Sequence, residues 1–265
     1  MTISSLPANP FAPDAQQGKI AVVSGASSGI GRATAELMAA TGWTVYAVAR
    51  RAERLESLAQ ATGVRPVVLD ITDAQAVAAR AQEILAETGG RLDALVNISG
   101  GALGADSVLE ADLADWANMF ELNVLGTLNM VKAFLPALRQ GGQGTVLNLT
   151  STAAEAGYEG GAGYNAAKFG QRALTETLRL EEAEHNVRVI EVRPGMVRTD
   201  EFALKRLGSA QAAAKVYAGV EKPLLAEDVA QTLTFALNIP HHINLDHITL
   251  RPVAQAAQYK VIRSL

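Results

Sequence analysis

The sequence predicts a single-domain α/β fold, in which a doubly wound parallel sheet of about seven strands is flanked by helices. Short β-branched runs alternate with longer amphipathic segments, as in chains built from right-handed strand–helix–strand units. Several of the short runs are apolar throughout, which is typical of strands that are covered on both faces. The chain has 265 residues, of which 49% are apolar and 19% charged. It is therefore long enough for one large core and too apolar to be disordered.

Each expected strand is a short apolar run, and each expected helix is a longer segment with apolar residues at the helical period. In chain order, the strands are 20–23, 44–49, 67–69, 94–98, 145–149, 187–192 and 247–250. The helices between them are 30–41, 52–61, 73–87, 113–138, 164–184 and 227–237. The apolar stripe of the fifth helix consists of Ala166, Phe169, Ala173, Leu174, Thr177 and Leu178.

Two segments fall outside this alternation. Residues 1–17 contain three prolines and no basic side chain, so we expect a flexible amino-terminal tail rather than a secretory signal, with the domain at 18–265. The stretch 200–222 is too long for an ordinary connection between strand and helix, and it predicts a lid. All apolar runs are far shorter than a bilayer span. We therefore expect a cytoplasmic protein without a membrane segment.

Composition excludes several classes of site. The absence of cysteine excludes disulfides, thiolate nucleophiles and Cys-based metal sites. With 23 basic and 27 acidic side chains, a net charge of −4 and 5% aromatic residues, the chain offers little to a nucleic acid. His241, His242 and His247 are close in sequence, but their spacing is poor for metal ligation, so we expect no metal site.

A glycine-rich loop joins the first strand to the first helix. Glycines at this point let the backbone turn tightly and approach a ligand closely. The helix that follows directs its free N–H groups and its positive dipole end at the same space. This arrangement predicts a pyrophosphate site of the dinucleotide-binding (Rossmann) type. The residues expected to hold the dinucleotide here are Gly25, Ser27, Ser28, Gly29, Ile30 and Gly31.

The end of the second strand indicates which dinucleotide binds. A carboxylate there would bind the ribose 2′-hydroxyl of NAD, but the strand ends in Arg50 and Arg51, and the first carboxylate after it is Glu53. Two guanidinium groups suit a 2′-phosphate, so NADP is favoured over NAD. The alternative is that the pair only begins a solvated helix. Residues after the third and fourth strands are expected at the same crevice, namely Asp70, Ile71, Asn97 and Gly100.

Tyr164 and Lys168 lie four residues apart on the expected fifth helix and therefore share one face. A phenol with its ordinary pKa of about 10 is a poor acid–base catalyst at neutral pH. A fixed ammonium group beside it would lower that pKa. Ser151 follows the fifth strand, where its hydroxyl could hold a carbonyl oxygen beside Tyr164. These three side chains predict a centre for proton transfer to or from a substrate oxygen.

With these motifs in place, the sequence closely resembles the short-chain dehydrogenase/reductase family, in its short single-domain branch. The resemblance extends from Lys19 to the last expected strand. It rests on the glycine loop at 25–31, on Asp70, on the Asn123 of Glu121-Leu122-Asn123-Val124, on Ser151, Tyr164 and Lys168, and on the run 193–199. Two departures are Ser24 in place of the usual Thr, and Asn97-Ile98-Ser99-Gly100 in place of Asn-Asn-Ala-Gly. We expect the cofactor pocket to survive both.

The resemblance implies roles for individual residues. Tyr164 would be the general acid/base and Ser151 would orient the substrate carbonyl. Lys168 would bind the nicotinamide ribose and tune Tyr164, while Asn123 would support a water relay to Lys168. The nicotinamide pocket would be lined by Pro194, Gly195, Val197 and Thr199.

The carboxyl-terminal third is similar to the NADP-dependent 3-hydroxy acid dehydrogenases, including the serine 3-dehydrogenase type, at 199–206, 225–230, 240–244 and 251–255. This similarity implies a small polar substrate. Arg206 is the candidate for binding its carboxylate or sulfonate, unless it is an ordinary surface arginine. Tyr158 would line the substrate mouth or lie in a surface turn. In this family the fourth and fifth helices pair across subunits, which implies a homotetramer.

The most favoured function is an NADP(H)-dependent oxidoreductase that interconverts an alcohol and a carbonyl on a small-molecule substrate, namely a small polar 3-hydroxy acid or a related aldehyde or ketone. One alternative keeps this reaction but assigns a bulkier ketone or a secondary-metabolite aldehyde, because the expected lid is rich in alanine at 210–214. Another alternative is a nucleotide-binding regulatory protein without turnover. The presence of Ser151, Tyr164 and Lys168 together argues against it.

Overall fold

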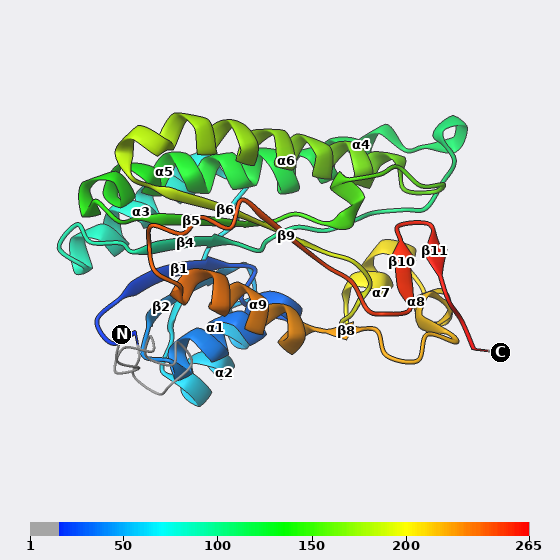
Figure 1. The fold of residues 1–265 in the computed structure, drawn as a ribbon, viewed down its shortest axis with the longest axis horizontal. Coiled ribbons are helices and arrows are strands. Elements are labelled where there is room, and N and C mark those ends of the chain that lie inside the picture. Colours follow the sequence, from blue (N-terminus) through cyan, green and yellow to red (C-terminus); the bar gives the residue numbers. More distant parts are fainter. Residues whose placement is uncertain (1–15, 265) are drawn as a thin grey trace, which may run out of the picture.

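A seven-stranded parallel sheet lies between two layers of helices in the computed structural model, which describes residues 16–264 (Figure 1). The strand order is β3-β2-β1-β4-β5-β6-β9, and every neighbouring pair is parallel. The direction of winding reverses between β1 and β4, so a ligand crevice is expected at the carboxyl ends of these strands. The predicted fold class is confirmed. Residues 1–15 of the predicted tail lie outside the described residues.

Every expected strand and helix is present. Three strands have the expected bounds, the helix expected at 113–138 is divided, and the other elements have shifted ends. The strands of the sheet are β1 (Ile20–Ser24), β2 (Thr44–Ala49), β3 (Arg65–Val68), β4 (Ala94–Asn97), β5 (Thr145–Leu149), β6 (Arg188–Pro194) and β9 (His247–Leu250). The helices are α1 (Gly29–Ala40), α2 (Ala52–Thr62), α3 (Ala74–Glu87), α4 (Leu113–Phe120), α5 (Gly126–Gly141), α6 (Ala162–Glu182), α7 (Phe202–Leu207), α8 (Ala210–Tyr217) and α9 (Ala226–Asn238). Two small strand pairs are β7 (Val197–Arg198) with β8 (Leu224–Leu225), and β10 (Gln255–Ala257) with β11 (Lys260–Val261).

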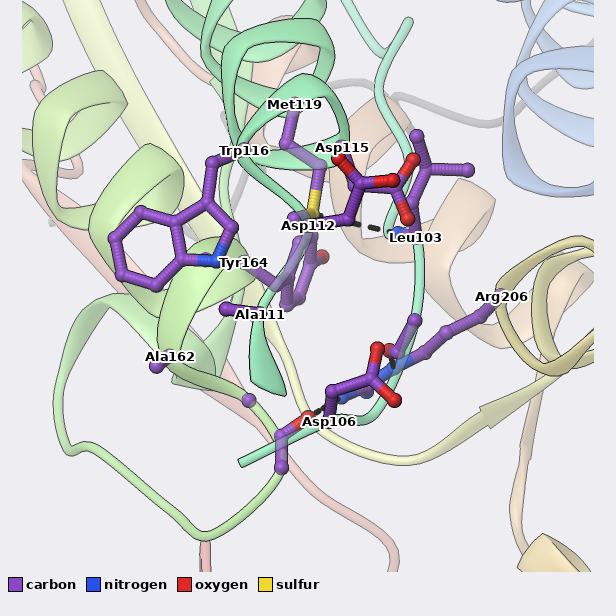
Figure 2. Close-up of a pocket in the computed structure, with 14 residues that line it drawn as sticks. Leu103, Asp106, Ala111, Asp112, Asp115, Trp116, Met119, Ala162, Tyr164 and Arg206 are labelled. Atoms are coloured by element: carbon purple, nitrogen blue, oxygen red, sulfur yellow. Dashed lines mark hydrogen bonds between the residues drawn. The ribbon is translucent and has the colours of Figure 1, made fainter. Parts of the chain in front are cut away.

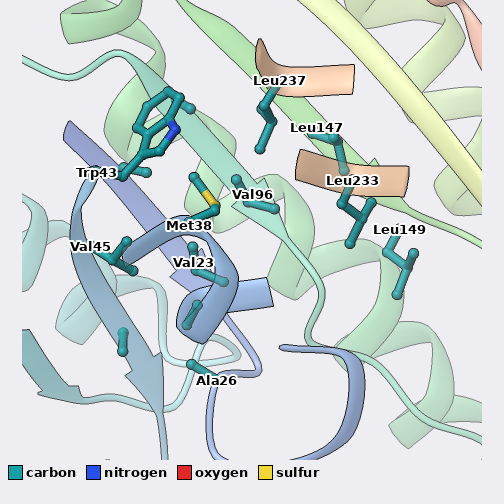
Figure 3. Close-up of a cluster of buried hydrophobic side chains, with 14 of the residues drawn as sticks. Val23, Ala26, Met38, Trp43, Val45, Val96, Leu147, Leu149, Leu233 and Leu237 are labelled. Carbon is teal, nitrogen blue, oxygen red and sulfur yellow. The ribbon is translucent and has the colours of Figure 1, made fainter. Parts of the chain in front are cut away.

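Both faces of the sheet are buried, which explains the continuous apolar strands. On one face α1, α2 and α9 cover the strands, and Met38 and Leu233 pack there against Val23 and Val96 (Figure 3). On the other face α3, α5 and α6 form a second cluster that includes Phe134. Trp43 is buried in the first cluster, and its Nε1 donates to Asn238 Oδ1 at 3.2 Å.

The helix expected at 113–138 is divided in the structure. A π-helical turn at Glu121–Leu125 separates α4 from α5. A π turn holds more residues than an α turn, so it interrupts a regular period without breaking the helix axis. The sequence pattern had indicated one continuous helix, because both parts are amphipathic.

The apolar stripe of α6 faces mainly outward. Phe169 is 41% exposed, and Ala166, Ala173 and Thr177 are also exposed. The buried face of α6 instead carries Tyr164, Ala167, Lys168, Gln171, Thr175 and Leu178. The stripe of apolar residues therefore does not mark the side of this helix that covers the sheet.

The segment predicted as a lid contains α7 and α8, which lie beside the β10–β11 hairpin (Figure 1). The chain that follows β11 is hydrogen-bonded to this segment, because Ser264 N donates to Gly219 O at 2.8 Å. Movement of this segment stays a prediction. No helix among residues 16–264 is long and apolar enough to cross a membrane.

Candidate active site

A cavity of about 1290 Å³ follows the carboxyl ends of the strands, from the glycine loop to Tyr164. It collects nearly all the residues predicted from the sequence. Those that line it are Gly25, Ser27, Ser28, Gly29, Ile30, Gly31, Arg50, Arg51, Asp70, Ile71, Gly100, Ser151, Tyr158, Tyr164, Lys168, Pro194, Gly195, Val197, Thr199 and Arg206. The strand order thus brings together residues that are far apart in the chain.

The glycine loop has the close packing expected of a phosphate cradle. Gly25 has a φ of +75°, a conformation that favours glycine. A Cβ on Gly31 would stand 2.2 Å from the carbonyl oxygen of Gly25, so only glycine fits there. Ser24 Oγ accepts from the N–H groups of Ile98 and Ser99, each at 3.1 Å. The hydroxyl that Ser24 shares with threonine therefore fixes the loop to the end of β4.

Arg51 lies directly over this loop, whereas Arg50 points elsewhere. The Nη2 atom of Arg51 donates to Ser27 Oγ and Ser28 Oγ, both at 2.8 Å. Arg50 is exposed, and its Nη1 lies 3.6 Å from Asp70 Oδ2. The Asp70 carboxylate in turn accepts from the backbone and hydroxyl of Thr72. Only Arg51 is thus fixed against the cradle.

Tyr164 lies in the first turn of α6, at the other end of the cavity, and is 8% exposed. Its hydroxyl is hydrogen-bonded to Ser151, which begins a short turn after β5. Burial raises the pKa of Tyr164, and the Ser151 hydrogen bond and the charge of Arg206 only partly oppose this. The phenol therefore carries its proton at neutral pH in this site.

Lys168 lies beside the Tyr164 ring and is hydrogen-bonded to other groups. Its Nζ lies 5.8 Å from the centre of the Tyr164 ring and donates to Leu149 O at 3.2 Å and to Gln171 Oε1 at 2.6 Å. Burial lowers the pKa of Lys168 to about 7, although the charge of Glu191 acts against this. The Lys168 side chain is thus desolvated and directed at other acceptors, and its effect on Tyr164 with a cofactor bound stays a prediction.

Asn123 lies in the π turn and is fully buried. Its Nδ2 donates to Met119 O at 2.7 Å and to Gly101 O at 2.9 Å, and its Oδ1 accepts from Gly101 N at 3.2 Å. A Cβ on Gly100 would stand 2.7 Å from Asn123 Oδ1 and 3.3 Å from Lys168 Nζ. Asn123 and Lys168 therefore approach the loop after β4 from two sides, with Gly100 between them.

Residues 19–208 match the family model described as short chain dehydrogenase. This chain belongs to the short-chain dehydrogenase family. It is 39% identical over 246 residues to serine 3-dehydrogenase of Rhizobium radiobacter, a match that covers 91% of this chain and 97% of the relative. It is 38% identical over 242 residues to sulfoacetaldehyde reductase 2 of Chromohalobacter salexigens, covering 89% and 95%.

A solved structure described as the closed form of serine dehydrogenase complexed with NADP+ has the same fold. The TM-score is 0.84 and the identity 31%, with 93% of this chain and all of the other chain covered. These similarities confirm the resemblance to the serine 3-dehydrogenase type. The cofactor and the substrate of this short-chain dehydrogenase must be inferred from its own residues.

Arg206 lines the cavity of this short-chain dehydrogenase, and it also lines a small pocket together with Asp106, Asp112 and Asp115 (Figure 2). Its side chain donates to Gly104 O at 3.1 Å, to Tyr158 Oη at 2.9 Å and to Gly160 O at 2.8 Å. Its guanidinium carbon lies 5.9 Å from the centre of the Tyr164 ring. Nη1 and Nη2 each carry a second N–H that these bonds leave for a ligand. Hydrogen bonds therefore fix Arg206 and Tyr158 in the lining of the cavity.

Asn97 is the exception among the predicted cofactor residues of this short-chain dehydrogenase. Its Nδ2 donates to Asn148 Oδ1 on β5 at 2.9 Å, and the side chain is buried within the sheet layer. The next residues, Ile98 and Ser99, line the cavity instead. The Asn97 side chain therefore does not line the described cavity, since alternate side chains of a strand point to opposite faces. A contact of Asn97 with the cofactor stays a prediction.

Sequence reasoning missed three contributors to the site. Gln171 is buried and joins Lys168 to Thr127, to whose Oγ1 its Nε2 donates at 3.0 Å. Phe202 packs edge-on against Tyr164, with ring centres 5.9 Å apart. Glu201 forms ion pairs with Arg51, Arg54 and Lys205. The spacing of Gln171, three residues after Lys168, could have revealed the first, but the other two depend on how α7 folds back.

Proposed function

We propose that this short-chain dehydrogenase is an NADP(H)-dependent oxidoreductase that interconverts an alcohol and a carbonyl on a small polar molecule. The observation that carries the proposal is the hydrogen-bonded pair Tyr164–Ser151, at one end of a continuous cavity whose other end is the glycine loop under Arg51. The lining of this cavity includes both the glycine loop and Tyr164. The relatives named serine 3-dehydrogenase and sulfoacetaldehyde reductase 2 support the same class of reaction.

The residues present fit a dinucleotide with a 2′-phosphate. The backbone of Gly31 packs closely on Gly25 O, which holds the glycine loop against the first turn of α1. The free N–H groups of that turn can bind a pyrophosphate. Arg51, Ser27 and Ser28 supply a guanidinium and two hydroxyls beside it, a donor set that suits a phosphate. When bound, NADP(H) supplies the hydride chemistry.

The protein's part in the reaction is proton transfer and positioning. Because burial keeps the Tyr164 phenol protonated, it can donate a proton to a carbonyl oxygen during reduction. Ser151 would hold the same oxygen, since its hydroxyl already lies within hydrogen-bonding reach of the phenol. Lys168 and Asn123 would fix the loop at Gly100 that faces the reacting end.

A small anionic substrate is favoured over a bulky ketone. Arg206 offers unsatisfied N–H groups within the cleft, where a carboxylate or sulfonate would be matched by its planar fork. The bulky alternative depended on the alanines at 210–214. Within residues 16–264, however, α8 lines the cavity with Val216 and Tyr217. The alanines therefore give no support to an apolar mouth.

The decisive experiment replaces Tyr164 by Phe. We expect kcat for NADPH-dependent reduction of sulfoacetaldehyde or a 3-oxo acid to fall by about 10²–10⁴, the usual share of a general acid. NADPH affinity, measured by fluorescence titration, should stay within about twofold. Tyr259→Phe is the matched control, because Tyr259 is 81% exposed on the β10–β11 hairpin. Full activity in Tyr164→Phe would contradict the assignment.

The alternative without turnover makes a different prediction for the same assay. Tight NADPH binding without NADPH consumption, across anionic, neutral and bulky carbonyl compounds alike, would favour a regulatory protein. A cytoplasmic location and a homotetramer also stay predictions, and the second has its own test below.

A further inference from the structure

The carboxylate of Glu201 lies inside the donor set that the proposed function assigns to the 2′-phosphate. Arg51 Nη1 donates to Glu201 Oε1 at 2.7 Å and to Oε2 at 2.9 Å. Ser28 Oγ donates to Oε2 at 3.3 Å, and Lys205 Nζ does so at 2.6 Å. Arg54 pairs with Oε1 as well. One carboxylate is thus surrounded by the cations and a hydroxyl that line this end of the cavity.

Arg51 has no spare face for a second anion in this arrangement. Its Nη1 is directed at Glu201, while its Nε and Nη2 are directed at Ser27 and Ser28. A phosphate bound by the same guanidinium would stand next to the Glu201 carboxylate. The Glu201 side chain is only 17% exposed, so water would screen the repulsion between the two anions poorly.

We propose that Glu201 is an internal anion that occupies the 2′-phosphate subsite and must leave Arg51 before NADP(H) binds. This inference rests on the proposed function, because it assumes that Arg51 receives the 2′-phosphate. Glu201 then acts as a specificity-determining residue. It weakens binding of the 2′-phosphorylated cofactor and leaves binding of the unphosphorylated one unchanged, since only the former needs Arg51.

The position of Glu201 in the chain connects this exchange to the substrate end of the cleft. Glu201 immediately precedes α7, a helix of six residues. The first residue of α7, Phe202, packs on Tyr164, and Arg206 near its end holds Tyr158 and Gly160. Release of Glu201 therefore frees the anchored end of a short helix whose other contacts surround the reacting centre.

A second role for Glu201, as acceptor for the ribose diol of NAD, fits the contacts less well. Both carboxylate oxygens of Glu201 already accept hydrogen bonds from the charged groups of Arg51 and Lys205. A diol would have to displace Arg51 or Lys205 and would offer a neutral donor in exchange. Charge-assisted bonds are roughly twice as strong as neutral ones, so that exchange is unfavourable.

The test uses adenosine 2′,5′-bisphosphate and 5′-AMP as probes, with titration calorimetry on the full chain. In Glu201→Gln we expect the bisphosphate to bind about tenfold more tightly, equivalent to about 1.4 kcal/mol. AMP affinity should not change. Glu56→Gln is the matched control, because it makes the same change at an exposed residue of α2 that does not line the described cavity, and it should leave both affinities as they are. In an Arg51→Ala background, Glu201→Gln should give no gain.

Several outcomes would overturn the inference. Equal bisphosphate affinity in Glu201→Gln and the unaltered protein would show that Glu201 does not compete. Loss of AMP binding in Glu201→Gln would make Glu201 a diol acceptor instead. An equal gain in Glu56→Gln would reduce the result to a general charge effect. If the unaltered protein and Glu201→Gln both bind AMP as well as bisphosphate, the NADP assignment itself fails. Should Glu201→Gln fold poorly, Glu201→Asp gives the same test, because the shorter side chain withdraws the carboxylate.

Discussion

Arg206 contacts both sides of the substrate pocket, and its two functions can be separated by experiment. It holds Gly104 O and Gly160 O, which belong to two loops, and it also faces Tyr164. Losing the first set of contacts would loosen the pocket for any substrate. Losing the guanidinium charge would affect only an anionic substrate.

Arg206→Ala should therefore raise KM for a carboxylate or sulfonate aldehyde at least about tenfold, as expected for a lost charge-assisted pair. KM for a neutral aldehyde of similar size should rise much less. Steady-state kinetics with both substrates measures the difference. Arg198→Ala is the control, since Arg198 is exposed on β7 and does not line the described cavity. An equal loss for both substrates would leave Arg206 only a structural role.

Residue identity in the site could be predicted wherever a motif has a fixed position on one element. Tyr164 and Lys168 share a face of α6, and Ser151 follows β5, so their meeting required only the order of the strands. The protonation states of the same side chains could not be predicted from the sequence. The pKa values of Tyr164 and Lys168 depend on how completely α6 is covered, and burial shifts both in directions that the spacing alone cannot indicate.

At the scale of elements, α7 is attached to the rest of the molecule by charge. Burial alone would raise the pKa of Glu201, but hydrogen bonds from Arg51, Lys205 and Arg54 outweigh it and hold that pKa at about 2, below the ordinary 4.5. The folded state therefore favours the ionised carboxylate. The stability that it contributes is complete above about pH 4.5 and is lost as the pH falls toward 2.

Glu201→Gln should accordingly lower the free energy of unfolding by about 1–2 kcal/mol at pH 7, a figure reduced for the exposure of Arg54 and Lys205. At pH 3 the difference between the variant and the unaltered protein should shrink by about half or more. Urea unfolding of the cofactor-free protein at several pH values measures this. A difference that stays constant from pH 7 to pH 3 would show that the ion pairs contribute no pH-dependent stability.

Elements with a strong local period were predicted almost to their ends, and those defined by a distant partner were not. β2, β5 and β9 have the expected bounds, because apolar runs and polar neighbours mark them. β3 begins at Arg65 rather than at Val67, since pairing with Tyr46 on β2 extends it. α7 and α8 were expected only as a long segment. Their sequence contains little periodic pattern, and contacts with the site fix them.

At the scale of the whole molecule, large apolar side chains are exposed on the neighbouring helices α6 and α4. Phe169 and Leu180 on α6 are 41% and 80% exposed, and Leu113 and Phe120 on α4 are 82% and 45% exposed. Apolar side chains gathered on neighbouring helices mark an interaction surface more often than a solvated one. They favour the predicted homotetramer.

Phe169→Glu combined with Leu180→Glu should therefore shift the sedimentation coefficient from that of a tetramer to that of a smaller species, because each buried charge costs about 2 kcal/mol or more. The far-ultraviolet circular dichroism should stay unchanged. Val68→Glu serves as the control, because Val68 is similarly exposed (47%) on the edge strand β3. A chain that sediments as a monomer before any substitution would contradict the prediction.

The π turn at Glu121–Leu125 sets the rotational phase of everything that follows it on α5. One additional residue in a helix turns later side chains by roughly 100°. Met130 and Phe134 on α5 face the core because the π turn has rotated the helix by this amount. Asn123 lies within the π turn itself. Deleting a single residue here would give a more regular helix and would swing the apolar side of α5 away from the sheet. The irregularity is thus a spacer of fixed length, and its length matters to the fold as much as any side chain within it.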